Sequence, residues 1–188
     1  MNLSDLKPTI LRRLVKFEDS LSKVGWFEAA GKLLNQEEKT MTTLYLKALG
    51  VKHRDINVVK EWQTVQKVAC RADWVPTWWQ TERDLSVALT AESKAVLGDG
   101  LFHSRMTQIM SKIFDPVPRE VSDILLSLDI RDEALIKSAT GAATEAVHQA
   151  ALGTIKVSNN NHPFLYKFQL FRAGRWPLGV YDDTFFIL

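Results

Sequence analysis

The strongest constraint on the fold of this chain is an alanine-rich segment over residues 131–152. Its alanines are Ala134, Ala139, Ala142, Ala143, Ala146, Ala150 and Ala151. Alanine has the highest helix propensity of all residues, and its small side chain lets neighbouring helices approach closely. The segment therefore predicts a helix at the centre of a helical body.

Apolar residues recur at helical spacing through most of residues 1–153. Asn35 is predicted to cap a helix that ends at Gly50, and Asp55 is predicted to cap the helix after it. The Gly-Asp-Gly run at residues 98–100 predicts a loop between two further helices. Together these patterns predict a bundle of six to seven helices.

The C-terminal part of the chain has the alternation of aromatic and other residues that is typical of strands. We predict strands over residues 164–171, 176–181 and 184–188, with a turn at Asp182-Asp183 and with Pro177 at a sheet edge or bulge. The predicted fold class is thus mainly α, with a small C-terminal antiparallel β-meander. Residues 1–188 are expected to form a single domain, in which the meander of residues 162–188 packs on the helical body of residues 1–153.

The charges of the chain nearly cancel, but they are unevenly placed. The chain holds 24 Lys and Arg and 22 Asp and Glu, which gives a net charge of +2. Residues 1–72 carry a net charge of +5, and residues 73–133 carry a net charge of −5. Basic and acidic helices that pair within the domain are one interpretation, and a charged face that meets a partner is the other. The balanced total disfavours nucleic acid, although the basic N-terminal third, including Arg12 and Arg13, keeps it as an alternative.

Targeting signals are missing from the sequence. Residues 1–14 lack the apolar core of a signal peptide, and no window approaches the roughly 18 apolar residues that span a bilayer. Cys70 is the only cysteine, so the chain cannot form an intrachain disulfide. We expect a cytoplasmic protein without a membrane partner.

The usual signatures of catalysis and cofactor binding are also missing. The sequence has no Gly-x-Ser-x-Gly elbow, no phosphate-binding loop and no cluster with zinc-ligand spacing, and Cys70 is predicted to be a buried small hydrophobe. Glu145 and His148 have the spacing used in di-iron bundles, but a second such pair is absent. They are weak metal candidates, and a solvated helix edge is the simpler interpretation. We predict no cofactor and no catalytic residue.

Tryptophan is the compositional outlier, with six in 188 residues. Trp62, Trp74, Trp78 and Trp79 lie close together in the sequence and could form an aromatic core between successive helices. Adjacent helix residues point about 100° apart, so Trp78 and Trp79 are not both expected to be buried. An exposed tryptophan is a favoured anchor for a protein partner. Trp74, Trp78, Trp79 and Trp176 are therefore our candidate ligand or partner surface.

Three functions are compatible with these patterns. The first is a non-enzymatic cytoplasmic protein-binding protein, such as an adaptor, an inhibitor or an immunity-type protein. The second is a helical-bundle enzyme or small-ligand-binding protein, with Glu145 and His148 as polar groups and Trp78 or Trp79 as the wall of a pocket. The third is nucleic-acid binding through the basic N-terminal third. Pairing of the aromatic C-terminal strands would add a homodimer to the first of these.

Overall fold

A computed structural model describes residues 3–52, 55–69, 76–157 and 161–188. The helices are α1 (Leu3–Leu21), α2 (Gln36–Ala48), α3 (Trp62–Ala69), α4 (Pro76–Leu97), α5 (Asp99–Phe114), α6 (Pro116–Ser127), α7 (Glu133–Lys156) and α8 (Pro163–Arg172). The strands are β1 (Asp55–Val58), β2 (Pro177–Tyr181) and β3 (Thr184–Ile187). The predicted fold class is confirmed, because the chain is mainly helical with a small sheet. Of the helices described, none is long and apolar enough to cross a membrane.

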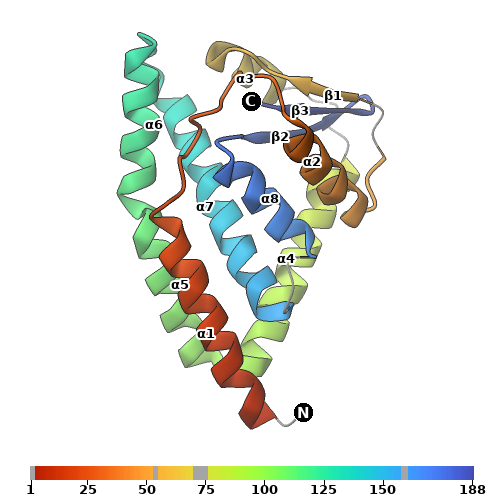
Figure 1. Ribbon diagram of the computed structural model, residues 1–188, viewed down its shortest axis with the longest axis vertical. Coiled ribbons are helices and arrows are strands. Elements are labelled where there is room, and N and C mark those ends of the chain that lie inside the picture. The colour runs from red at the N-terminus through yellow and green to blue at the C-terminus, as the bar shows by residue number, and fades with distance from the viewer. Residues whose placement is uncertain (1–2, 53–54, 70–75, 158–160) are drawn as a thin grey trace.

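The alanine-rich helix α7 lies at the centre of the helices, as predicted. Figure 1 shows α7 running between α1 and α5 on one side and α8 and α4 on the other, with the sheet at one end. Ala139, Ala143, Ala146 and Ala150 have no exposed surface, because neighbouring helices pack directly onto them. The small side chains of α7 thus let the helices of the body share one core.

The sheet is mixed rather than a simple meander. Its strand order is β1-β3-β2, in which β2 and β3 form an antiparallel hairpin and β1 pairs with β3 in parallel. The predicted turn is confirmed, since Asp182 and Asp183 have φ angles of 46° and 58°, the sign that a type I′ hairpin turn needs. Pro177 lies on the edge strand β2, also as predicted. The prediction that Asp55 caps a helix is wrong, because Asp55 begins β1 and pairs with Thr184.

The predicted strand over residues 164–171 is wrong, because this segment forms helix α8. Local signals for a helix are present: the His162 side chain accepts a hydrogen bond from the Phe164 backbone N–H, and Pro163 occupies the first turn. The apparent alternation typical of a strand arose because apolar residues lie on nearly all sides of this helix, so alternate positions are also apolar. A helix that is apolar all round belongs in a core, and α8 is largely buried between α7 and α2.

The predicted loop at residues 98–100 is also wrong. Asp99 and Gly100 form the first turn of α5, and Gly98 alone links α5 to α4. Gly98 has a φ of 87°, which only glycine adopts without strain, so one residue reverses the chain. Two glycines in three residues therefore do not require a loop of three residues.

An aromatic cluster joins the helical body to the sheet, and of the four tryptophans predicted to form an aromatic core it contains Trp62. The rings of Phe27, Trp62 and Trp176 lie within 5.6–5.9 Å of one another, centroid to centroid. All three side chains are buried. Aromatic pairs at this separation stabilise a core beyond the area they bury, by about 1 kcal/mol for each pair.

Candidate functional site

A cavity of about 450 Å³ lies between α4, α7, α8 and the start of β2. It brings together four residues that the sequence analysis named as candidates: Trp78 and Trp79 of α4, Glu145 of α7, and Trp176 just before β2. Its volume is within the range of about 300–1,000 Å³ that small-molecule sites occupy. The remaining candidate, Trp74, lies outside the described residues.

The tryptophans at the cavity differ in exposure. Trp79 is 42% exposed, Trp78 is half-buried, and Trp176 is 5% exposed. The expected difference between the adjacent Trp78 and Trp79 is therefore present. Trp176 presents a buried face to the cavity from the aromatic cluster, whereas Trp79 lies where a ligand or partner can reach it from solvent.

A buried ion pair borders the same cavity. Lys167 of α8 donates to Glu82 of α4 at 2.9 Å between Nζ and Oε2, and each residue is only 5% exposed. The other Glu82 oxygen accepts a 2.6 Å hydrogen bond from the Tyr45 hydroxyl, which accepts in turn from Trp78 Nε1 at 3.0 Å. Burial, together with the charge of Glu82, holds the pKa of Tyr45 well above its usual value, so the phenol stays a donor.

Gln149 connects this ion pair to Glu145. Its side-chain oxygen accepts from Lys167 Nζ at 3.0 Å, and its amide nitrogen donates to Glu145 Oε1 at 3.1 Å. An ammonium group only donates and a carboxylate only accepts, so the chemistry fixes the orientation of the amide. Lys167 has three N–H groups and uses two of them; among the described residues the third has no partner.

The structure separates the two weak metal candidates. Glu145 lines the cavity, but His148 of the same helix is half-buried outside its lining. Burial lowers the pKa of His148, while the charge of Glu145 opposes this shift. Within the described ranges of the chain, no three His, Cys, Asp or Glu side chains come together to hold a metal ion.

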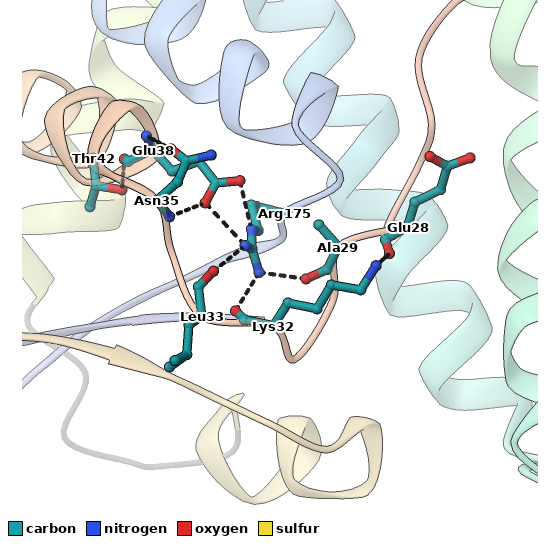
Figure 2. A network of polar contacts seen from close by, with 8 residues as sticks. All are labelled: Glu28, Ala29, Lys32, Leu33, Asn35, Glu38, Thr42 and Arg175. Atoms are coloured by element: carbon teal, nitrogen blue, oxygen red, sulfur yellow. Dashed lines mark hydrogen bonds and ion pairs between the residues drawn. The ribbon is translucent and has the colours of Figure 1, made fainter.

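A second buried ion pair lies between the end of α8 and the start of α2 (Figure 2). Arg175 Nε and Nη2 donate to the two oxygens of Glu38 at 3.1 and 3.0 Å. The Arg175 Nη groups also donate to the backbone carbonyls of Ala29, Lys32 and Leu33. These contacts use all five guanidinium N–H groups, so none is left for a ligand.

Local sequence explains why Arg175 points into this network. Gly174, with a φ of 76°, ends α8 in a Schellman motif: the Gly174 N–H bonds Phe171 O at 2.9 Å and the Arg175 N–H bonds Leu170 O at 3.0 Å. A Cβ atom at Gly174 would lie 2.6 Å from the backbone nitrogen of Ala29, so only glycine permits this approach. The turn thereby directs the Arg175 side chain at residues 29–33.

The other half of the network comes from the predicted cap of α2, which is confirmed. Asn35 Oδ1 accepts from the Glu38 N–H at 2.9 Å, and Glu38 Oε2 accepts from the Asn35 N–H at 2.8 Å, which completes a capping box. An acidic residue in the first turn of a helix complements the helix dipole, as Glu38 does here. The structure also buries Glu38, which is 5% exposed, against Arg175.

No protein-family model, no curated protein and no solved structure matches this chain. Sequence reasoning missed Lys167, Glu82 and Gln149, which link the aromatic wall to Glu145. One signal was available for Lys167, because it is the single charged residue in the apolar run of residues 163–171. A charged residue inside a largely apolar helix needs a buried partner, but the sequence does not say which one.

Proposed function

We propose that the protein binds a small organic ligand in the cavity between α4, α7, α8 and β2. The observation that carries this proposal is the buried ammonium group of Lys167, which borders a tryptophan-lined cavity. One of its three N–H groups has no partner among the described residues. Ligand sites in proteins combine apolar and aromatic walls with a few placed polar groups, and this cavity has that composition. The proposal corresponds to the second of the three functions that the sequence allowed, in its ligand-binding form.

The placement of the ion pair supports ligand binding over a purely structural role. Burying a lysine and a glutamate costs desolvation energy that their attraction often fails to recover, so an apolar pair could serve stability equally well. In the Lys167–Glu82 pair, the third N–H of Lys167 has no partner among the described residues, and it borders a cavity that also includes the solvent-exposed Trp79. A ligand with a hydrogen-bond acceptor would use that N–H.

The test is a fragment screen by ligand-observed NMR against the wild-type protein, Trp79→Ala and Phe114→Ala. Phe114 is 78% exposed at the end of α5 and does not line the cavity, so it is a matched control for the loss of an exposed aromatic ring. We expect fragments that bind the wild type and Phe114→Ala, and that bind Trp79→Ala at least about ten-fold more weakly, because stacking on one indole contributes roughly 1–3 kcal/mol. Absence of any bound fragment, or equal binding to Trp79→Ala, would refute the proposal.

A protein partner is the second candidate function, and one observation favours it. Trp79 and Val87 are 42% and 64% exposed, lie about two helical turns apart on α4 and both border the cavity. An exposed tryptophan beside a second apolar residue is a typical anchor in protein interfaces. A photo-reactive residue placed at position 79, with position 114 as control, should then cross-link to one host protein only from position 79.

A further inference from the structure

The Gln149 amide shows what the groups at the cavity can recognise. Its C=O binds the Lys167 ammonium and its N–H binds the Glu145 carboxylate, so these two side chains are spaced to hold both polar groups of one amide. Each retains capacity for a second one: Lys167 has its third N–H, and Glu145 Oε2 accepts no hydrogen bond from the described residues. Lys167 is 5% exposed and Glu145 is exposed, so this capacity extends from the buried end of the cavity to solvent.

On this basis we propose that Lys167 and Glu145 bind the C=O and the adjacent N–H of a neutral planar ring, that is, a lactam. The inference rests on the proposed function and names the class of ligand. The ring C=O accepts from Lys167 Nζ, and the ring N–H donates to Glu145 Oε2. Both hydrogen bonds involve one charged group, and such bonds are roughly twice as strong as neutral ones.

The charges around the cavity favour a neutral ligand. Its charged lining consists of Glu82 and Glu145 against Arg83 and Lys167, so it has no excess of either sign. A ligand carboxylate that binds Lys167 also meets the two glutamates, and a ligand ammonium that binds Glu145 also meets Lys167. A neutral lactam meets neither repulsion and supplies the acceptor and the donor together.

The walls favour a flat ring. Trp78 and Trp79 on α4 and Trp176 before β2 line the cavity, and indole rings pack best against planar, polarisable groups. The cavity volume of about 450 Å³ admits a bicyclic ring system. The hydrogen bonds from Lys167 to the ring C=O and from the ring N–H to Glu145 would then fix which edge of the ring faces the buried end of the cavity.

The test compares four bicyclic probes of similar size on the wild-type protein by isothermal titration calorimetry. They are 2-quinolone, a lactam; N-methyl-2-quinolone, which lacks the N–H; 2-naphthoate, an anion; and 2-naphthylmethylammonium, a cation. We expect 2-quinolone to bind at least about ten-fold more tightly than each of the others, since N-methylation removes the hydrogen bond to Glu145 and each charged probe meets a like charge in the cavity lining. Stronger binding of the anion or the cation would overturn the lactam assignment while leaving ligand binding intact.

Glu145→Gln provides an independent measurement, because residue 145 is exposed and the substitution keeps an oxygen for Gln149. The variant then presents an NH₂ group where the lactam N–H would donate. We expect its preference for 2-quinolone over N-methyl-2-quinolone to fall below about two-fold, with N-methyl-2-quinolone bound as in the wild type. Glu133→Gln, an exposed change at the start of the same helix, should keep the preference.

The outcomes separate the two proposals. An unchanged preference in Glu145→Gln would overturn the role of Glu145. Failure of all four probes, with fragments still bound at the cavity, would overturn the lactam assignment only. Failure of the probes and of the whole fragment screen would overturn the proposed function as well.

Discussion

Two buried ion pairs in this protein have similar burial and opposite character. Arg175–Glu38 and Lys167–Glu82 are each separated by more than 80 residues in sequence, and all four side chains are nearly inaccessible. Arg175 donates all five N–H groups to protein acceptors, whereas Lys167 borders a cavity and donates two of its three N–H groups to the residues that the structure describes. Burial of charge alone therefore does not distinguish the two pairs; our proposal of a binding site rests on the hydrogen-bonding capacity that Lys167 keeps at a cavity.

The choice of cation fits this difference. A guanidinium group presents five N–H groups in a fixed plane, which suits an array of one carboxylate and three carbonyls that must be held rigidly (Figure 2). An ammonium group on a flexible stem presents three donors that can be redirected. The pair with arginine thus fixes the loop before α2 against the end of α8, whereas the pair with lysine has the adjustable donor that the proposed ligand binding requires.

Replacing Arg175 should have the largest effect on stability. Arg175→Met leaves the Glu38 carboxylate buried without its cation and leaves three carbonyls without a donor. We expect the free energy of unfolding to fall by about 3–5 kcal/mol, measured by urea denaturation. Arg119→Met, a change at an exposed arginine of α6, is the control and should cost less than about 0.5 kcal/mol. A loss below about 1 kcal/mol for Arg175→Met would show that this network is not structural.

Lys167→Met should cost less, about 2 kcal/mol by the same measurement, because Glu82 keeps the hydrogen bond from Tyr45 and borders the cavity. Adding Glu82→Gln removes the unpaired charge and should recover at least half of that loss. If the double variant is no more stable than Lys167→Met, the lysine acts through packing rather than through its charge. The two ion pairs would then not differ in how their charges contribute to stability.

Asn35→Ala tests the capping box that positions Glu38. Loss of the hydrogen bond from the Glu38 N–H to Asn35 Oδ1 should cost about 1 kcal/mol in urea denaturation, the usual effect of removing an N-cap. Gln36→Ala, at the exposed next residue, should change stability by only a few tenths of a kcal/mol. If the two substitutions have equal effects, the Asn35 cap does not stabilise this network, and its stability depends on Arg175.

The smallest effect on stability is expected from pH, which acts on the N-terminal cap of α8. This helix contains Lys167 and is followed by Arg175. Burial, helped by Lys156, lowers the pKa of His162, and its neutral Nδ1 accepts from the Phe164 N–H at 3.2 Å. Because the folded pKa lies below the unfolded value of about 6.5, this stabilisation is present above pH 6.5 and is lost as the pH falls. His162→Asn keeps a capping acceptor without the titration.

The melting temperatures of the wild type and His162→Asn, measured between pH 7.5 and 5.5, check this expectation. The wild type should lose more stability on acidification than His162→Asn, and His103→Asn, at an exposed position of α5, should follow the wild type. Parallel pH profiles for wild type and His162→Asn would contradict the role given to His162.

The sequence predicted those features of the fold that depend on near neighbours. Helical periodicity and the alanines of α7 gave the mainly helical body and its central helix, Asn35 gave the start of α2, and Asp182-Asp183 gave the hairpin turn. Each depends on residues a few positions apart, where propensity, capping and backbone angles act. For the same reason, α8 was mistaken for a strand: its local pattern allowed either structure, and burial against α7 and α2 decided between them.

The sequence also named Trp78, Trp79, Trp176 and Glu145, and one of its three functions placed Glu145 in a pocket walled by Trp78 or Trp79. Only the tertiary structure brought all four to one cavity and added Lys167, Glu82 and Gln149 to it. The partner of a buried charge is determined by which helices pack together, and Lys167 and Arg175 find theirs 85 and 137 residues away. Local chemistry therefore determined most of the helices and the hairpin turn, whereas tertiary packing decided the helical state of α8 and the partners of the buried charges, because a charge left unpaired in the core is costly.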